Sequence, residues 1–241
     1  MAVTELPQTV AAFHALVGIA AVTTSLASFM AHPTPDGLHK VASYLGAGVG
    51  SMTFTGSLIA YGALSGKLKK GYDLPYKEYL NRPLSALNVL GLSAMLSSNA
   101  YTLGLLALIN TTVSSGLLGW NITKSIGSAD MPVAITVLNS YSGWALCAEG
   151  FMLNNTMLTI VGSLIGSSGA ILSYIMCKAM NRTLSNVIFG GSYGSVGQGT
   201  GEAMKIEGVH TETSSDQVGE ILTQSKEVII VPGYGLAAAQ G

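Results

Sequence analysis

Charged residues are scarce in this chain, since Asp, Glu, Lys and Arg together make up only 10% of its 241 residues. A soluble domain usually carries about 25% of such residues. With 49% hydrophobic residues, the chain has too few polar groups to cover a water-exposed surface of its size. The net charge of -1 gives no basic surface that would indicate a nucleic-acid partner. The composition therefore predicts a membrane protein whose first partner is the lipid bilayer.

The sequence patterns of several common sites are also missing. Cys147 and Cys177 are the only cysteines, and both lie in apolar stretches. They predict neither a disulfide framework nor a metal site. The sequence contains no Ser-His-acid arrangement, no Walker loop and no pair of catalytic carboxylates. The first apolar run is too long for a signal peptide and follows no basic residue. We expect no metal and no complete active site within this chain.

Glycine, by contrast, is abundant, with 30 residues, and membrane helices use glycine where they pack closely. Six apolar segments are each long enough to cross about 30 Å of hydrocarbon, which takes about 20 helical residues. They cover residues 7–30, 39–64, 83–103, 105–123, 131–153 and 156–180. Gly104 separates the third segment from the fourth. We predict an all-α polytopic membrane protein with a six-helix transmembrane bundle.

The positive charges favour one orientation of these segments in the membrane. Lysine and arginine residues cluster where segments end on one shared side, at Lys67, Lys69, Lys70, Lys77, Arg82, Lys124, Lys178 and Arg182. The opposite side offers only Lys40. Because positive residues collect on the inner side of a membrane, we predict that both ends of the six-segment region lie inside.

The character of the chain changes after residue 182. Residues 183–226 resemble a linker, with a glycine-rich stretch over 190–201 and a short amphipathic helix over 216–225. A β-branched run over 227–231 follows, and then the pattern Gly233-Tyr234-Gly235-Leu236-Ala237-Ala238. A strand followed by a G-x-G-x-x-A turn begins a dinucleotide-binding unit, in which the glycines approach a pyrophosphate. Because the sequence stops at Gly241, we expect a truncated Rossmann-like tail and interpret the chain as a fragment.

Polar groups inside membrane segments are costly, and by default they predict function. His14 lies as far beyond Pro7 as Asn139 lies beyond Pro132. Both are therefore about 10 Å into their helices, at one depth. Since imidazole exchanges protons near neutral pH, the pair suggests a proton relay. The alternatives are a histidine satisfied by a neighbouring carbonyl and an asparagine that joins two helices by hydrogen bonds.

Three further features each allow two interpretations. Asp130 precedes the fifth segment and would cap it, or it would contact a soluble domain together with Arg182. Glu149, near the outer end of that segment, would reach the surface with its side chain or serve a function. Gly162-x-x-x-Gly166 predicts close helix packing, but a helix that slides or rotates would carry the same glycines.

Several motifs occur in a fixed order: LPQTVAAFHALVG at 6–18, ADMP at 129–132, LNSYSGW at 138–144, GSSGAILSYIMCKAMNR at 166–182 and VPGYGLAAAQ at 231–240. Together they resemble the proton-translocating (Re/Si-specific) NAD(P)+ transhydrogenases. The resemblance implies that hydride passes from NADH to NADP+ on soluble domains while a proton crosses the membrane inward. It implies that His14 and Asn139 belong to the proton path. It also implies that Asp130 and Arg182 couple this path to the NADP(H) domain.

The same resemblance implies that the NADP(H) pyrophosphate lies against Gly233, Tyr234, Gly235 and Ala238. NAD(H) would bind a domain or subunit absent from this chain, and the complete enzyme would be a homodimer. The membrane would be the mitochondrial inner membrane or a bacterial plasma membrane. Residues 1–182 would form the proton-translocating domain, and 227–241 would begin the NADP(H)-binding domain. The fragment alone would be inactive.

Two other classes of protein compete with this interpretation. A secondary transporter with a soluble nucleotide-sensing tail would be expected to show inverted repeats. The first three and last three segments show no such repeat. A membrane anchor would leave His14 and Asn139 at one depth without an explanation.

Overall fold

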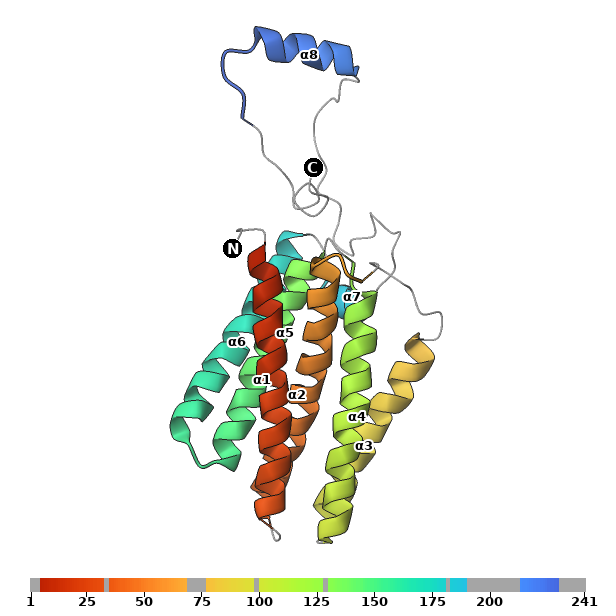
Figure 1. Ribbon diagram of the computed structural model, residues 1–241, viewed down its shortest axis with the longest axis vertical. Coiled ribbons are helices and arrows are strands. Elements are labelled where there is room, and N and C mark those ends of the chain that lie inside the picture. Colours follow the sequence, from red (N-terminus) through yellow and green to blue (C-terminus); the bar gives the residue numbers. More distant parts are fainter. Residues whose placement is uncertain are drawn as a thin grey trace. The chain divides into compact units, whose positions relative to one another are not determined.

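The computed structural model describes residues 5–32, 35–68, 77–97, 100–127, 130–180, 183–189 and 213–229. The chain divides into two compact units, Met1–Gln198 and Gly199–Gly241. In the first unit, long helices lie side by side, and the short helix α7 follows them (Figure 1). Their bounds are α1 Leu6–Ala31, α2 Gly37–Leu64, α3 Lys77–Ser97, α4 Tyr101–Ser125, α5 Met131–Met152, α6 Thr156–Ala179 and α7 Leu184–Phe189. The residues that the structure describes contain no strand.

Three of these helices, α1, α4 and α6, have the length and apolar composition of a membrane span. Large apolar side chains also point outward, as at Phe13, Leu106 and Leu164, each more than 60% exposed. Exposed apolar surface of this extent marks a membrane or a protein interface. These features confirm the predicted all-helical fold and are consistent with an integral membrane protein. That all six long helices cross the membrane stays a prediction.

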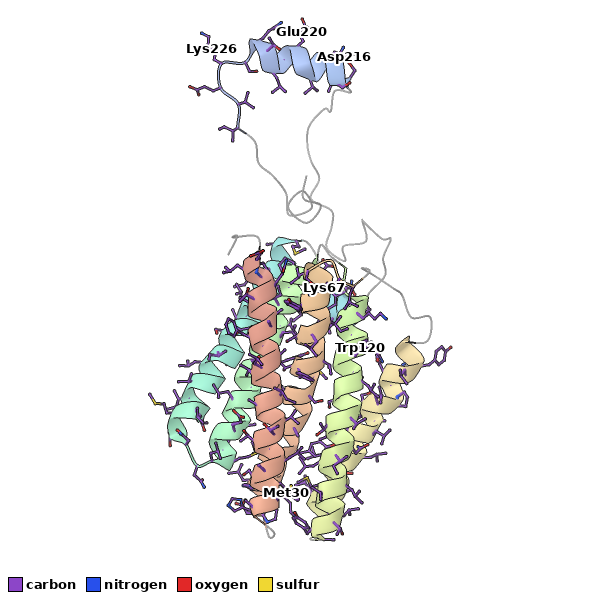
Figure 2. The ribbon with its side chains drawn as sticks, in the orientation of Figure 1. Met30, Lys67, Trp120, Asp216, Glu220 and Lys226 are labelled. Atoms are coloured by element: carbon purple, nitrogen blue, oxygen red, sulfur yellow. The ribbon has the colours of Figure 1, made fainter. Side chains whose placement is uncertain are left out.

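The two ends of the helices differ in charge. Figure 2 shows Lys67, just beyond α2, and Met30, near the end of α1, at opposite ends of the helices. Lys124 and Lys178 lie in the last turns of α4 and α6. We call the end with these lysines the inner end, and the end with the α1–α2 connection the outer end.

The boundary between α3 and α4 differs from the prediction. It lies between Ser97 and Tyr101, so Gly104 is inside the first turn of α4 rather than between two helices. A Cβ placed on Gly104 would lie 2.6 Å from Cζ of Phe29. This glycine therefore makes room for the Phe29 ring. Pro83, which was expected at the start of the third helix, lies inside α3.

Helices α5 and α6 make their closest contacts through glycine. A Cβ on Gly143 would collide with the backbone of Gly166, and a Cβ on Gly162 would collide with the backbone at Cys147. At the same contact, the Ser140 hydroxyl of α5 donates a hydrogen bond to the Gly166 carbonyl of α6 at 2.7 Å. The Gly162-x-x-x-Gly166 pattern thus forms the packing surface that the sequence predicted.

The second unit contains helix α8, Ser215–Gln224. Ser214 and Gln217 cap its start through reciprocal hydrogen bonds. Figure 2 labels Asp216 and Glu220 on this helix, whose polar and apolar faces agree with the predicted amphipathic segment. The strand predicted over 227–231 is not formed at residues 227–229, because no strand pairs with them in the part of the chain that the structure describes. Gly233, Tyr234, Gly235 and Ala238 lie outside the described residues.

Replacing Gly143 by alanine tests the α5–α6 contact. The added Cβ would push α6 away from α5, and overpacking of this kind usually costs about 1–3 kcal/mol. We expect a lower unfolding temperature for the Gly143→Ala protein in detergent. Gly37→Ala is the matched control, because a Cβ at Gly37 has nothing within 4 Å. Equal unfolding temperatures for both variants would contradict the glycine contact.

Candidate functional site

The His14 side chain on α1 contacts α5. Its ring nitrogen Nδ1 lies 3.0 Å from the hydroxyl oxygen of Ser142. His14 is half-buried, and Ser142 is buried. Two helices far apart in the sequence therefore meet through a polar pair inside the packed helices.

The hydroxyl of Ser142 decides where the imidazole carries its proton. The hydroxyl oxygen also lies 3.0 Å from the Leu138 carbonyl oxygen, which can only accept a hydrogen bond. Since the hydroxyl has one proton, both contacts are satisfied when Ser142 donates to Leu138 and His14 donates its Nδ1 proton to Ser142. The neutral ring then has a lone pair on Nε2, which can take up a proton.

Asn139 lies one turn before Ser142 on α5 and is half-buried. Among the described residues, no hydrogen bond of its side chain is found. The structure thus places Ser142, and not Asn139, in direct contact with His14. Sequence reasoning missed Ser142, although its position three residues after Asn139 places it on the same helix face.

Ser57 on α2 is a second buried hydroxyl that sequence reasoning missed. It is fully buried, and its oxygen has no hydrogen-bond partner among the described residues. A buried polar group without a partner costs about 1–3 kcal/mol and is commonly satisfied by water. No sequence pattern distinguishes Ser57, because α2 contains many small hydroxyl residues.

Asp130 occupies the N-cap position of α5, at the inner end. The predicted capping role is wrong, because the carboxylate makes no capping hydrogen bond. The residue is only 6% exposed, and Val133, three residues farther along α5, packs against Cys177 in the last turn of α6. A buried carboxylate therefore lies where α5 begins and α6 ends. Arg182, its predicted opposite charge, lies outside the described residues.

A small cavity lies at this inner end, between α2, α4, α5 and α7. Its lining is mainly apolar and includes Thr123 and Tyr141. Val187 and Ile188 of α7 also line it. Helix α7 precedes the second unit in the sequence. Leu138 and Tyr141 belong to the lining as well. They lie one turn apart, so a single face of α5 borders this cavity.

Glu149 lies near the outer end of α5 and is half-buried. Thr24 on α1 lies beside its carboxyl group. The carboxyl group is therefore near the contact between α1 and α5. Within the described ranges, no three His, Cys, Asp or Glu side chains converge as metal ligands.

These features define a class: an α-helical protein of membrane character with a hydrogen-bonded imidazole between two of its helices. The chain belongs to the NAD(P) transhydrogenase beta subunit family, whose model matches residues 1–241. This confirms the resemblance to the transhydrogenases that the sequence motifs show.

Two curated relatives illustrate the match. Both are NAD(P) transhydrogenase subunit beta from Rhodospirillum rubrum, and each is 42% identical to this chain over 249 residues. The alignment covers 98% of this chain and 52% of each relative. The chain therefore spans about half the length of these relatives. Both are bacterial, which does not support the predicted mitochondrial membrane.

The variant Ser142→Ala tests the proton arrangement at His14. In the unchanged protein, we expect nitrogen NMR of labelled histidine to show the proton of His14 on Nδ1. Removal of the hydroxyl leaves this N–H without its acceptor, so the ring should shift toward the Nε2-protonated form. Ser114→Ala, which removes a buried hydroxyl bonded to Asn88 on α3, should leave the His14 signals unchanged. A neutral His14 with its proton on Nε2 before the substitution would refute the arrangement.

Proposed function

We propose that this chain is the membrane proton-translocating part of an NAD(P)+ transhydrogenase. In this function, inward proton movement is coupled to hydride transfer from NADH to NADP+. Family membership over residues 1–241 supports the proposal. The observation that carries it is the hydrogen bond between His14 on α1 and Ser142 on α5. An ionisable group held between membrane-length helices is the feature that a proton path requires.

The proposed topology has all six long helices crossing the bilayer, with both ends of this region inside. Residues 1–182 form the proton-translocating domain, and residues 183–226 link it to the start of the NADP(H)-binding domain at 227–241. The helix α7 and the helix α8 both lie in this linker. The compartment is a mitochondrial inner membrane or a bacterial plasma membrane, and the bacterial relatives favour the second.

His14 exchanges protons with one side of the membrane at a time. In the neutral ring, Ser142 holds Nδ1–H, so Nε2 accepts the incoming proton. The charged ring then donates from both nitrogens, and it releases a proton when the opposite side becomes accessible. Asn139, one turn nearer the inner end, would donate and accept hydrogen bonds along the inner part of the path.

Asp130 and Arg182 couple the path to the soluble domain. The start of α5, which carries the buried Asp130, packs against the last turn of α6 through Val133 and Cys177, so a shift of either helix changes the environment of Asp130. A bound nucleotide biases such a shift only if it binds the two arrangements with different affinity. The glycine contacts between α5 and α6 transmit the shift along the helices.

The remaining components belong to the complete enzyme. The pyrophosphate of NADP(H) would lie against Gly233, Tyr234, Gly235 and Ala238. The bound NADP+ would accept the hydride. NAD(H) would bind a partner domain or subunit, and the complete enzyme would be a homodimer with Re/Si specificity. This chain by itself would not catalyse hydride transfer.

Replacing His14 tests the proposed function directly. In the complete enzyme, reconstituted in sealed vesicles, we expect His14→Ala to lower turnover and internal pH change together, by about 100-fold or more, because a positioned acid–base group typically contributes that much. The measurement follows reduction of an NADP+ analogue by NADH together with a pH-sensitive dye inside the vesicles. NADP+ should still bind, and Ser114→Ala should behave as the unchanged enzyme. Unaltered turnover with unaltered proton movement would show that His14 is only packed.

Replacing Asp130 by asparagine tests the coupling. The change keeps the shape of the side chain but removes its charge, and with it the proposed attraction between Asp130 and Arg182. We expect coupled turnover to fall by about tenfold or more, while purified protein still binds NADP+. Asp216→Asn on the exposed helix α8 is the control for the same chemical change. Full coupled turnover in the Asp130→Asn enzyme would rule out this role.

A further inference from the structure

Small and polar side chains repeat along one face of α1 and along the facing side of α2. On α1 they are His14, Gly18, Ala21, Ser25, Ser28 and His32. On α2 they are His39, Ser43, Gly46, Gly50, Thr53 and Ser57. Both sets repeat with alternating steps of four and three residues, which keeps them on one face of each helix. We call the surface that these residues form the α1–α2 seam.

Close contacts cross the seam at several levels. A Cβ on Gly18 would lie 2.7 Å from the Gly50 carbonyl oxygen, and a Cβ on Gly46 would lie 2.5 Å from the Ser25 hydroxyl oxygen. Farther out, the Ser28 hydroxyl lies 3.3 Å from Nε2 of His39. The seam therefore runs from the level of His14 to the outer end of both helices, with small or polar groups at every level.

The seam contains a buried hydroxyl that needs a partner. Ser43 is fully buried, and its oxygen has no hydrogen-bond partner among the described residues. It lies one turn after His39 and one turn before Gly46, hence between the levels of Ser28 and Ser25. Ser25 is also fully buried, and it donates to its own helix at the Ala21 carbonyl. Water at Ser43 would satisfy the hydroxyl and connect the serines of the outer half.

Two imidazoles lie at the outer end of the seam. The ring centroids of His32 and His39 are 4.8 Å apart. Ser28 joins them, because its carbonyl lies 2.8 Å from Nδ1 of His32 and its hydroxyl contacts His39. His32 is exposed and His39 is half-buried. A proton taken from water by His32 is thus one step from His39, and His39 is hydrogen-bonded to the first hydroxyl of the seam.

We propose that His32 and His39 take up protons on the outer side and that these protons reach His14 along the α1–α2 seam. The inference rests on the proposed proton-translocating function. A proton leaves one imidazole nitrogen, passes through hydroxyl or water oxygens, and binds to the next imidazole nitrogen. No electrons are exchanged. The seam supplies the path, and the histidine pair supplies the exchange with bulk water.

Other titratable groups lie at the same end of the helices. Asp36 caps α2, because its carboxylate accepts a hydrogen bond from the backbone N–H of His39 at 2.9 Å. Lys40 follows His39 in the sequence. Tyr44 on α2 bonds to the Asn88 carbonyl on α3, and Tyr101 at the start of α4 stacks on Phe29. Glu149 with Thr24 lies at the α1–α5 contact and is the competing group for proton uptake.

The test uses the complete enzyme in sealed vesicles with the outer side facing the bath and a fixed internal pH. Turnover toward NADPH formation is measured as a function of bath pH for the double variant His32→Asn, His39→Asn. We expect turnover close to that of the unchanged enzyme at bath pH 6 and a loss of about tenfold or more at bath pH 9, where protons are scarce and a collecting group matters. Imidazole added to the bath should restore the lost turnover, which a purely structural role would not permit.

A second variant tests the seam itself. Ser43→Ala removes the hydroxyl without adding any atom to this buried position, so it should slow turnover at every bath pH, without rescue by imidazole. Glu149→Gln is the control for the competing group and should keep the pH profile of the unchanged enzyme. Retained NADP+ binding and an unchanged unfolding temperature verify that each variant is folded.

Several outcomes would overturn the inference. They are an unchanged pH profile in the double variant, a loss that is equal at all bath pH values and not rescued by imidazole, or a pH-dependent loss in Glu149→Gln instead. The His14→Ala enzyme separates the two proposals. If it is inactive while the double variant is unaffected, the proton-translocating function stands and the outer uptake site is elsewhere.

Discussion

Close approach of helix backbones is the constraint on which the rest of this structure depends. In lipid, apolar side chains gain little by leaving the bilayer for one another, so helices associate through shape and hydrogen bonds. Gly18 with Gly50 and Gly143 with Gly166 bring backbones into contact. At these distances a serine or threonine on one helix reaches a carbonyl on the next. Thr55 of α2, for example, donates to the Gly116 carbonyl of α4 at 2.8 Å.

The same packing explains why most hydroxyls donate their proton to a carbonyl of their own helix and only a few in the described part of the chain lack such a partner. Ser25, Thr53 and Ser173 each donate to a carbonyl one turn back in their own helix. Ser142 does so as well, and this fixes it as an acceptor toward His14. Ser43 and Ser57 have no such partner among the described residues. A hydroxyl in this structure is therefore a candidate for proton transfer when its own helix does not already accept its hydrogen bond.

Much of this fold could be predicted from the sequence because apolar length and glycine content are local signals. Helices α1, α2, α5 and α6 begin and end close to the predicted residues, where Pro7, Pro132 and Asn155 mark the first turns. The start of α4 could not be predicted in this way. Gly104 looked like a break, but its lack of a side chain serves a contact with Phe29, which is 75 residues away in the sequence.

In the candidate site too, features set by position along one helix could be predicted, and features set by packing between helices could not. The depth of His14 followed from counting residues along one helix, and this suggested α5 as the neighbour. The contact with Ser142 instead of Asn139 depends on how α1 and α5 are rotated, which periodicity does not determine. The capping role predicted for Asp130 failed for the same reason, because a local preference for the N-cap gave way to burial against the end of α6.

The tight contact of Gly18 with Gly50 has a consequence for gating. It lies between the outer hydroxyls and His14, and backbones in contact leave no room for water. If protons reach His14 along this seam, the connection must open by a small displacement of α1 against α2. Such a displacement would also move His14 relative to Ser142, because the same helix carries both contacts. Proton access and the hydrogen bond at Nδ1 would then change together, so that one motion switches the side from which the imidazole exchanges its proton.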